Sequence, residues 1–79
     1  MSKWQIKHTR REYTAEIKGG RFFIVEDRGY PRGRTGNNFS VSRALDSQSL
    51  MNDIKNIFGD KIFNEIQTTL QSVKAKLKL

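Results

Sequence analysis

All seven arginines of this chain fall within its first 43 residues, and the guanidinium group is the most distinctive chemistry that the sequence offers. They are Arg10, Arg11, Arg21, Arg28, Arg32, Arg34 and Arg43. Residues 1–43 carry ten Lys or Arg against four Asp or Glu, a balance of +6, whereas residues 44–79 carry five against four, a balance of +1. A guanidinium presents a planar fork of donors that fits phosphates and base edges, while a lysine ammonium is a hydrated point charge. The distribution of arginines predicts a surface that binds a polyanion. In the alternative interpretation, these side chains form a basic face that only contacts solvent.

The densest cluster is the segment 28–34, RGYPRGR, which holds three arginines and Tyr30 but no acidic residue. Its glycines let the backbone approach a phosphate chain, its arginines neutralise phosphates, and an aromatic ring can stack on an unpaired base. We therefore predict nucleic-acid contacts by Arg28, Tyr30, Arg32 and Arg34, with Arg10, Arg11 and Arg21 as further candidates. The alternative is an ordinary exposed hairpin loop whose arginines keep it soluble.

The residues needed for side-chain catalysis are nearly absent. Catalysis needs a nucleophile with its base, paired carboxylates or a metal cluster. The chain has no cysteine, and its single histidine, His8, alternates with Trp4 and Ile6, which predicts a partly buried strand residue. Glu26 and Asp27 are adjacent in a predicted strand and would point to opposite faces. We therefore predict a binding protein rather than an enzyme, with no metal and no cofactor.

Period-two alternation of apolar and polar residues predicts the elements that position these side chains. The pattern predicts strands over residues 4–9, 12–18 and 38–43, and the apolar run at 21–27 predicts one more strand. Gly19 and Gly20 favour a tight turn that needs positive φ, and residues 28–37 are broken by three glycines and Pro31, which predicts a loop. Residues 21–27 are apolar on both faces, as in a central strand or one whose second face meets a ligand or another subunit. Together these segments predict a four-stranded antiparallel meander.

Helical spacing follows the strands. Asp46 or Ser47 can cap a helix with an apolar stripe at positions 50, 54, 57 and 58, and a second stripe follows at positions 62, 66, 70, 73 and 77. In one straight helix the two stripes would face opposite sides, so we predict a break at Gly59 and helices over 47–58 and 60–77, as two helices or one kinked helix. The fold class is α+β, a single domain over 1–79 with a basic sheet part (1–43) and a helical part (46–78).

The bulk properties of the chain bear on its location and association. No apolar run approaches the roughly 18–20 residues of a membrane span, and the first residues lack the apolar core of a signal peptide, so we expect a cytoplasmic protein that contacts no membrane. A chain of 79 residues buries a modest core and often gains stability by pairing. We predict a homodimer through the second helical stripe or the second face of strand 21–27. In the alternative, both helices pack on one sheet face of a monomer.

The order of these features resembles a known family, the positive cofactor four type of transcriptional coactivator. The matching segments are WQI at 4–6, KGGRFFIVEDRGY at 18–30, GRTG at 33–36, FSV at 39–41 and LMNDI at 50–54. The resemblance implies a dimer that regulates transcription and binds single-stranded DNA with sheet and loop residues. It implies DNA contacts for Lys18, Tyr30 and Arg34. Asn37, Asn38 and the second helix have no counterpart in the family pattern.

The amino-acid sequence thus predicts a protein that binds nucleic acid with little dependence on base sequence, and single-stranded DNA is the favoured partner. Two other functions stay open. A duplex-DNA module could lay a three-stranded sheet in the major groove. A small inhibitor or adaptor of the kind that phages encode could instead dock its basic face on an acidic protein.

Overall fold

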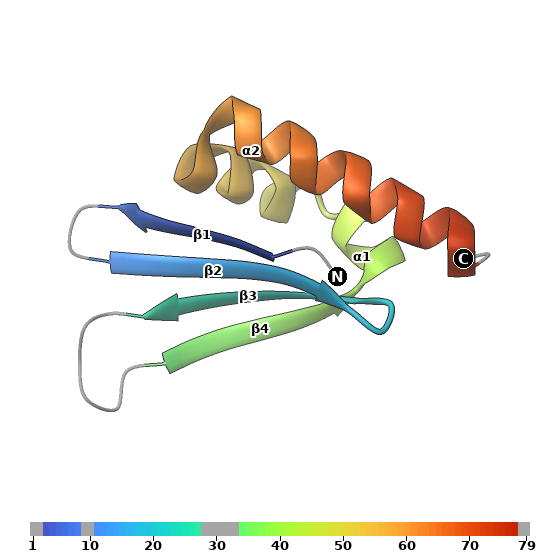
Figure 1. Ribbon diagram of the computed structural model, residues 1–79, viewed down its shortest axis with the longest axis horizontal. Helices are drawn as coiled ribbons and strands as arrows, with labels where there is room; N and C mark the ends of the chain where they lie inside the picture. Colours follow the sequence, from blue (N-terminus) through green and yellow to red (C-terminus); the bar gives the residue numbers. More distant parts are fainter. Residues whose placement is uncertain (1–2, 9–10, 28–33, 78–79) are drawn as a thin grey trace.

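The computed structural model describes residues 3–8, 11–27 and 34–77, and the side chains of residues 34 and 35 lie outside the description. Four strands come first and helix follows, as Figure 1 shows. The strands are β1 (Lys3–His8), β2 (Arg11–Lys18), β3 (Arg21–Asp27) and β4 (Arg34–Ser40), and the helices are α1 (Val41–Asp46) and α2 (Gln48–Leu77). The predicted α+β class, an antiparallel sheet followed by C-terminal helix, is confirmed.

The four strands form one antiparallel meander in the order β1-β2-β3-β4. Gly19 and Gly20 connect β2 to β3 with φ of 58° and 77°, the two positive values that a tight primed hairpin turn requires. The turn sets the register by placing Lys18 opposite Arg21 and Ile17 opposite Phe22. The predicted central position of strand 21–27 is confirmed, since β3 lies between β2 and β4.

The sheet has one face against the helices and one face without them. Tyr13, Ala15 and Ile17 are buried on the helix side of β2, and Phe22 is buried opposite Ile17 on β3. The alternation predicted for residues 12–18 is therefore confirmed. Trp4 is half-buried on the same side, and its indole Nε1 donates to Glu65 Oε2 of α2 at 3.3 Å. His8 differs from its prediction, because it is exposed at the end of β1.

The helix α2 bends at Gly59, which has φ 85° and ψ 167°. The Ser47 hydroxyl accepts from the Leu50 amide at 3.2 Å and caps the start of α2. Both the predicted cap at Ser47 and the predicted break at Gly59 are confirmed. The break turns two stripes of one helix toward the same sheet, since Met51, Ile54 and Phe58 before it and Ile66 and Leu70 after it are all buried.

The fourth strand was predicted too late in the chain. It runs over Arg34–Ser40 and not over 38–43, so part of the predicted loop 28–37 is strand. Residues 41–46 instead form α1, in which Val41 and Ala44 are buried one turn apart. The Ser40 side chain accepts from the Arg43 amide and ends the strand as a helix cap.

Both arms of α2 cover the same face of the sheet (Figure 1). Phe58, before the bend, meets the Tyr13 ring edge-on with 6.4 Å between ring centroids. After the bend, Glu65 bonds Trp4, and a Cβ on Gly20 would lie 2.7 Å from Leu77 Cδ1. The predicted dimer surface on the second helical stripe is therefore wrong, because Ile66 and Leu70 are fully buried within the chain. The alternative, with both arms on one face of the sheet, is what the structure shows.

Candidate nucleic-acid interface

The side of the sheet that faces away from the helices is the open face. Successive strand residues alternate between the two sides and directly paired residues share a side, so the register assigns its members. They are Lys3, Gln5 and Lys7 of β1, Glu12, Thr14, Glu16 and Lys18 of β2, Arg21, Phe23, Val25 and Asp27 of β3, and Gly36, Asn38 and Ser40 of β4.

Charge on the open face is balanced across most of the sheet. The register pairs Lys3 with Glu16 and Lys7 with Glu12 between β1 and β2. At the β2–β3 hairpin two cations lie directly opposite each other, Lys18 and Arg21. Like charges in this position repel. Positive charge without an acid opposite it is therefore found at the hairpin end.

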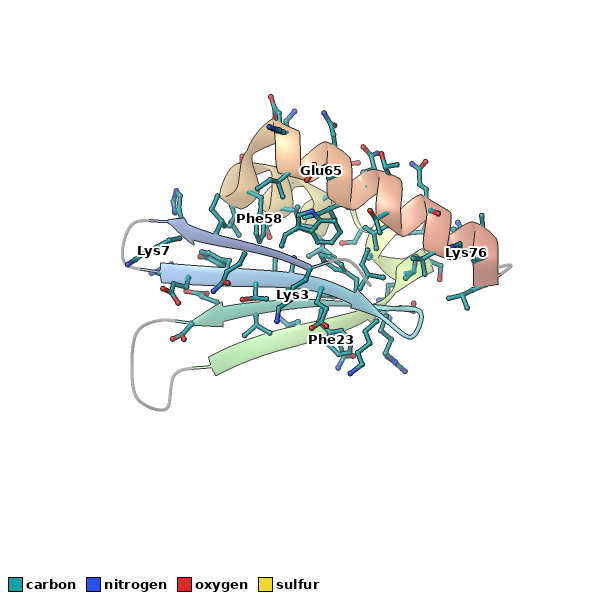
Figure 2. The ribbon with its side chains drawn as sticks, viewed as in Figure 1. Lys3, Lys7, Phe23, Phe58, Glu65 and Lys76 are labelled. Carbon is teal, nitrogen blue, oxygen red and sulfur yellow. The ribbon has the colours of Figure 1, made fainter. Side chains whose placement is uncertain are left out.

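Two apolar side chains occupy the middle of the open face. Phe23 and Val25 of β3 are half-buried, although no helix covers them. Figure 2 shows Phe23 on the side of the sheet away from α2, whereas Phe58 lies between α2 and the sheet. An aromatic ring in this position can stack on an unpaired base, and every base has a face to offer.

Beside the hairpin end, a hollow of about 420 Å³ opens between β3, β4 and α1. We call it the hairpin-end hollow, and its lining residues are Arg21, Asn38, Phe39, Ser40 and Arg43. Arg21 Nη1 donates to Asn38 Oδ1 at 3.4 Å, and the Arg43 amide donates to Ser40 Oγ at 3.3 Å. Both arginine side chains are exposed at this hollow.

Arg43 is the site residue that sequence reasoning missed. With residues 38–43 assigned to a strand, Arg43 would have ended that strand some distance from Arg21. The structure turns the chain into α1 at Val41 and returns Arg43 to the hollow beside Arg21. The signal in the sequence was Ser40, a good helix cap three residues before Arg43.

The predicted contact residues fall into two groups at opposite ends of the sheet. Lys18 and Arg21 lie together at the β2–β3 hairpin. Arg11 lies at the other end of β2, about 23 Å away at 3.3 Å per residue. Its register places it on the helix side, where its Nε lies 3.5 Å from Glu26 Oε1. The structure therefore does not unite Arg11 with Lys18 and Arg21.

Most of the remaining predicted contact residues lie outside the part of the chain that the structure describes. Arg10, Arg28, Tyr30 and Arg32 lie outside the described residues, and Arg34 is described only as the first backbone position of β4. His8 pairs with Arg11 and Asp27 pairs with Arg34 at the end of the sheet that Arg11 occupies. The end of β1, the start of β2, the end of β3 and the start of β4 therefore lie at the same end of the sheet (Figure 1). The sequence alone had left that relation open.

Other kinds of site find little support in the described part of the chain. Within it, no three His, Cys, Asp or Glu side chains gather as a metal site requires. Among the same residues, no helix has the length and hydropathy to cross a membrane. Comparisons with family models, with curated proteins and with solved structures found no match to this chain. The resemblance to the positive cofactor four type thus rests on the sequence segments alone.

Proposed function

We propose that this protein binds single-stranded nucleic acid, DNA in preference, with little dependence on base sequence. The bound nucleic-acid strand lies on the open face of the sheet. The protein acts by binding and not by catalysis. The observation that carries the proposal is an uncovered sheet face with Phe23 and Val25 at its centre and the unbalanced pair Lys18 and Arg21 at its end. Stacking on the ring and neutralisation of phosphates are the two interactions that bind single strands without reading their sequence.

The length of the sheet supports a binding track rather than a point contact. Lys18 and Arg21 mark one end, and the paired positions Asp27 and Arg34 mark the other end. A nucleic-acid strand running between these two ends crosses about 20 Å of sheet, six residue steps at about 3.3 Å each. Phe23 lies along this path. In this proposal the arginines of residues 28–34 hold phosphates at the far end of the track.

A salt-titrated binding assay tests the proposal. Fluorescence anisotropy of a dye-labelled oligothymidylate is measured with the full chain over a series of salt concentrations. We expect the logarithm of affinity to fall linearly with the logarithm of salt, with about −0.7 of slope for each phosphate neutralised. Lys61→Gln is the matched control, because it removes one charge from an exposed helix position outside the open face. It should leave the affinity unchanged.

Competing oligonucleotides separate the alternatives. Unlabelled single strands should displace the probe at lower concentrations than duplex of the same length. A preference for duplex would overturn single-strand binding and favour a sheet placed in the major groove. If the chain bound neither at about 0.15 M salt, where nucleic-acid proteins still bind, the nucleic-acid function would be wrong and an acidic protein partner would replace it.

A further inference from the structure

The hairpin-end hollow brings together two guanidinium groups from different elements. Arg21 comes from the start of β3 and Arg43 from α1, and both line the same hollow of about 420 Å³. Asn38 and Ser40 of β4 line it as well. Asn38 Oδ1 accepts from Arg21, so the amide nitrogen of Asn38 is left to donate to a ligand. Ser40 Oγ accepts from the Arg43 amide and can donate its own proton.

The backbone around the hollow fixes the two arginines to one frame. The Val41 amide donates to the Gly20 carbonyl at 3.0 Å, which ties the first residue of α1 to the β2–β3 turn. Ser40 lies directly opposite Arg21 in the sheet and also caps α1. The turn, the end of β4 and the start of α1 therefore fix the backbone positions of Arg21 and Arg43 at the rim of the same hollow.

The positive charges at the hollow favour binding of an anion. Among the residues that the structure describes, no carboxylate lies within ion-pair distance, 4.0 Å, of Arg21, Arg43 or Lys18. Lys18 stands directly opposite Arg21 and adds a third cation to the hairpin end. A guanidinium fork matches the oxygens of a phosphate in a planar, two-bonded geometry. Two forks at one hollow can therefore hold one phosphate from two sides.

We propose that the hairpin-end hollow is a phosphate-binding subsite in which Arg21 and Arg43 hold a single phosphate group. The inference rests on the proposed function, and it takes that phosphate to be part of the bound strand. Phe23 lies two residues from Arg21 on the same face of β3, about 7 Å along the strand. A nucleotide whose phosphate occupies the hollow can therefore place its base on the Phe23 ring. This neighbouring ring favours a nucleotide over the carboxylate of an acidic peptide.

The first test separates one shared phosphate from two independent ones. Arg21→Gln, Arg43→Gln and the double variant are compared with wild type and with Lys61→Gln in the oligothymidylate assay. We expect each single variant to bind about 10- to 100-fold more weakly, as for loss of one hydrogen bond to a charged group. Because both arginines hold the same phosphate, the double variant should lose less than the product of the two single losses. Its salt slope should flatten by about 0.7, the value for one phosphate, and not by about 1.4.

Two results of this test would overturn the subsite while leaving the proposed function in place. In one, both single variants bind oligothymidylate like Lys61→Gln. In the other, the double variant flattens the slope by about 1.4, which means two separate phosphates. The urea unfolding midpoint of each variant should stay near that of wild type, because both side chains are exposed. That measurement shows that a loss of binding is not a loss of fold.

The second test needs no oligonucleotide. Inorganic phosphate is titrated into the full chain at constant ionic strength, with chloride as the matched anion, and backbone amide signals are followed by NMR. We expect shifts centred on residues 21 and 38–43 that disappear in the double variant. Shifts in a protein that binds no oligonucleotide would support the phosphate site and overturn the proposed function. The phosphate site would be overturned if phosphate shifted no signals at these residues. It would also be overturned if polyglutamate displaced the oligothymidylate probe and inorganic phosphate did not.

Discussion

Phe22 and Phe23 are adjacent in β3 and lie in opposite environments. Phe22 is fully buried between the sheet and the helices, whereas Phe23 is half-buried on the open face. The alternation of a strand sends neighbouring side chains to opposite sides. The first ring therefore serves the core, and the second is available to a ligand. Sheet geometry, and not residue type, decides which aromatic side chain can act in binding.

Replacement of Phe23 by leucine tests the stacking role. Phe23→Leu keeps an apolar side chain and removes the ring, so we expect oligothymidylate affinity to fall about five- to tenfold. The salt slope should stay unchanged, because a stacking contact releases no counterions. Phe63→Leu is the matched control, since Phe63 is half-buried on α2 away from the open face. Anisotropy titrations at two salt concentrations measure both quantities, and equal affinity for Phe23→Leu and wild type would exclude the ring as a platform.

For the arginines at positions 32 and 34 we expect the opposite effect on the salt slope. Arg32→Gln combined with Arg34→Gln should weaken binding to all single strands alike and flatten the salt slope by about 1.4, the value for two phosphates. Tyr30→Ala should lower affinity with its slope nearly unchanged, as for Phe23→Leu. The same titrations with oligonucleotides of different base composition measure these effects. Wild-type binding in both variants at every salt concentration would remove this segment from the site.

At the scale of elements, two glycines with positive φ predict opposite outcomes for the same substitution. Gly19, with φ 58°, begins the β2–β3 turn, and Asn-Gly is a favoured pair for such hairpins. Gly59 bends α2 at φ 85° and ψ 167°, a region that only glycine enters readily. An added Cβ would meet nothing within 4 Å at either position, so backbone conformation alone decides the effect. We expect Gly19→Asn to be near neutral and Gly59→Asn to destabilise the fold by about 1–3 kcal/mol.

Urea unfolding of the two variants measures the difference. Gly59→Ala should behave like Gly59→Asn, because neither side chain tolerates this combination of φ and ψ. The slope of free energy against urea should stay the same, so that the midpoint reports stability directly. Equal losses for Gly19→Asn and Gly59→Asn would contradict the assignment of distinct backbone requirements to the turn and the bend.

Most elements were predictable, because local patterns specify them. Period-two alternation located β1 and β2, an apolar run located β3, and the incompatible stripes on either side of Gly59 required a bend. The predicted bounds of the fourth strand were wrong because Phe39, Val41 and the serines beside them alternate as in a strand. Val41 and Ala44 also fit one helical turn. Capping by Ser40 and the hydrogen bond from the Val41 amide to the Gly20 carbonyl stabilise residues 41–46 as a helix. A bond between residues so far apart in sequence leaves no local pattern.

The candidate site was predictable only in part, for the same reason. Arginine density indicated a polyanion, and Lys18 with Arg21 could be placed at one turn. The hairpin-end hollow forms where β3, β4 and α1 meet, so the partnership of Arg21 with Arg43 depends on the fold. The pairing of Lys3 with Glu16 and of Lys7 with Glu12 likewise appears only once the register is known. A count of charges could not show that most of the open face is balanced.

For the whole molecule, the folding of α2 onto one side of the sheet narrows the surfaces left for association. The stripe bearing Ile66 and Leu70 is occupied within the chain, which leaves the second predicted surface, around Phe23 and Val25 on the open face. The predicted homodimer would therefore use the surface that we propose for nucleic acid. Two ligands that compete for one surface cannot occupy it together, so each should displace the other.

We therefore predict that self-association and the binding of single-stranded nucleic acid exclude each other. Sedimentation equilibrium of the free protein at micromolar concentration should give a mass above the 9.2 kDa monomer. A saturating short oligothymidylate should reduce the assembly to one chain per oligonucleotide, and Phe23→Leu should weaken self-association and strand binding together. Phe63→Leu should change neither. A monomer mass for the free protein would refute the dimer. A complex with two chains on one short oligonucleotide would move the dimer contact away from the open face, to an edge strand such as β1 or β4, which the meander leaves without a neighbour on its outer side.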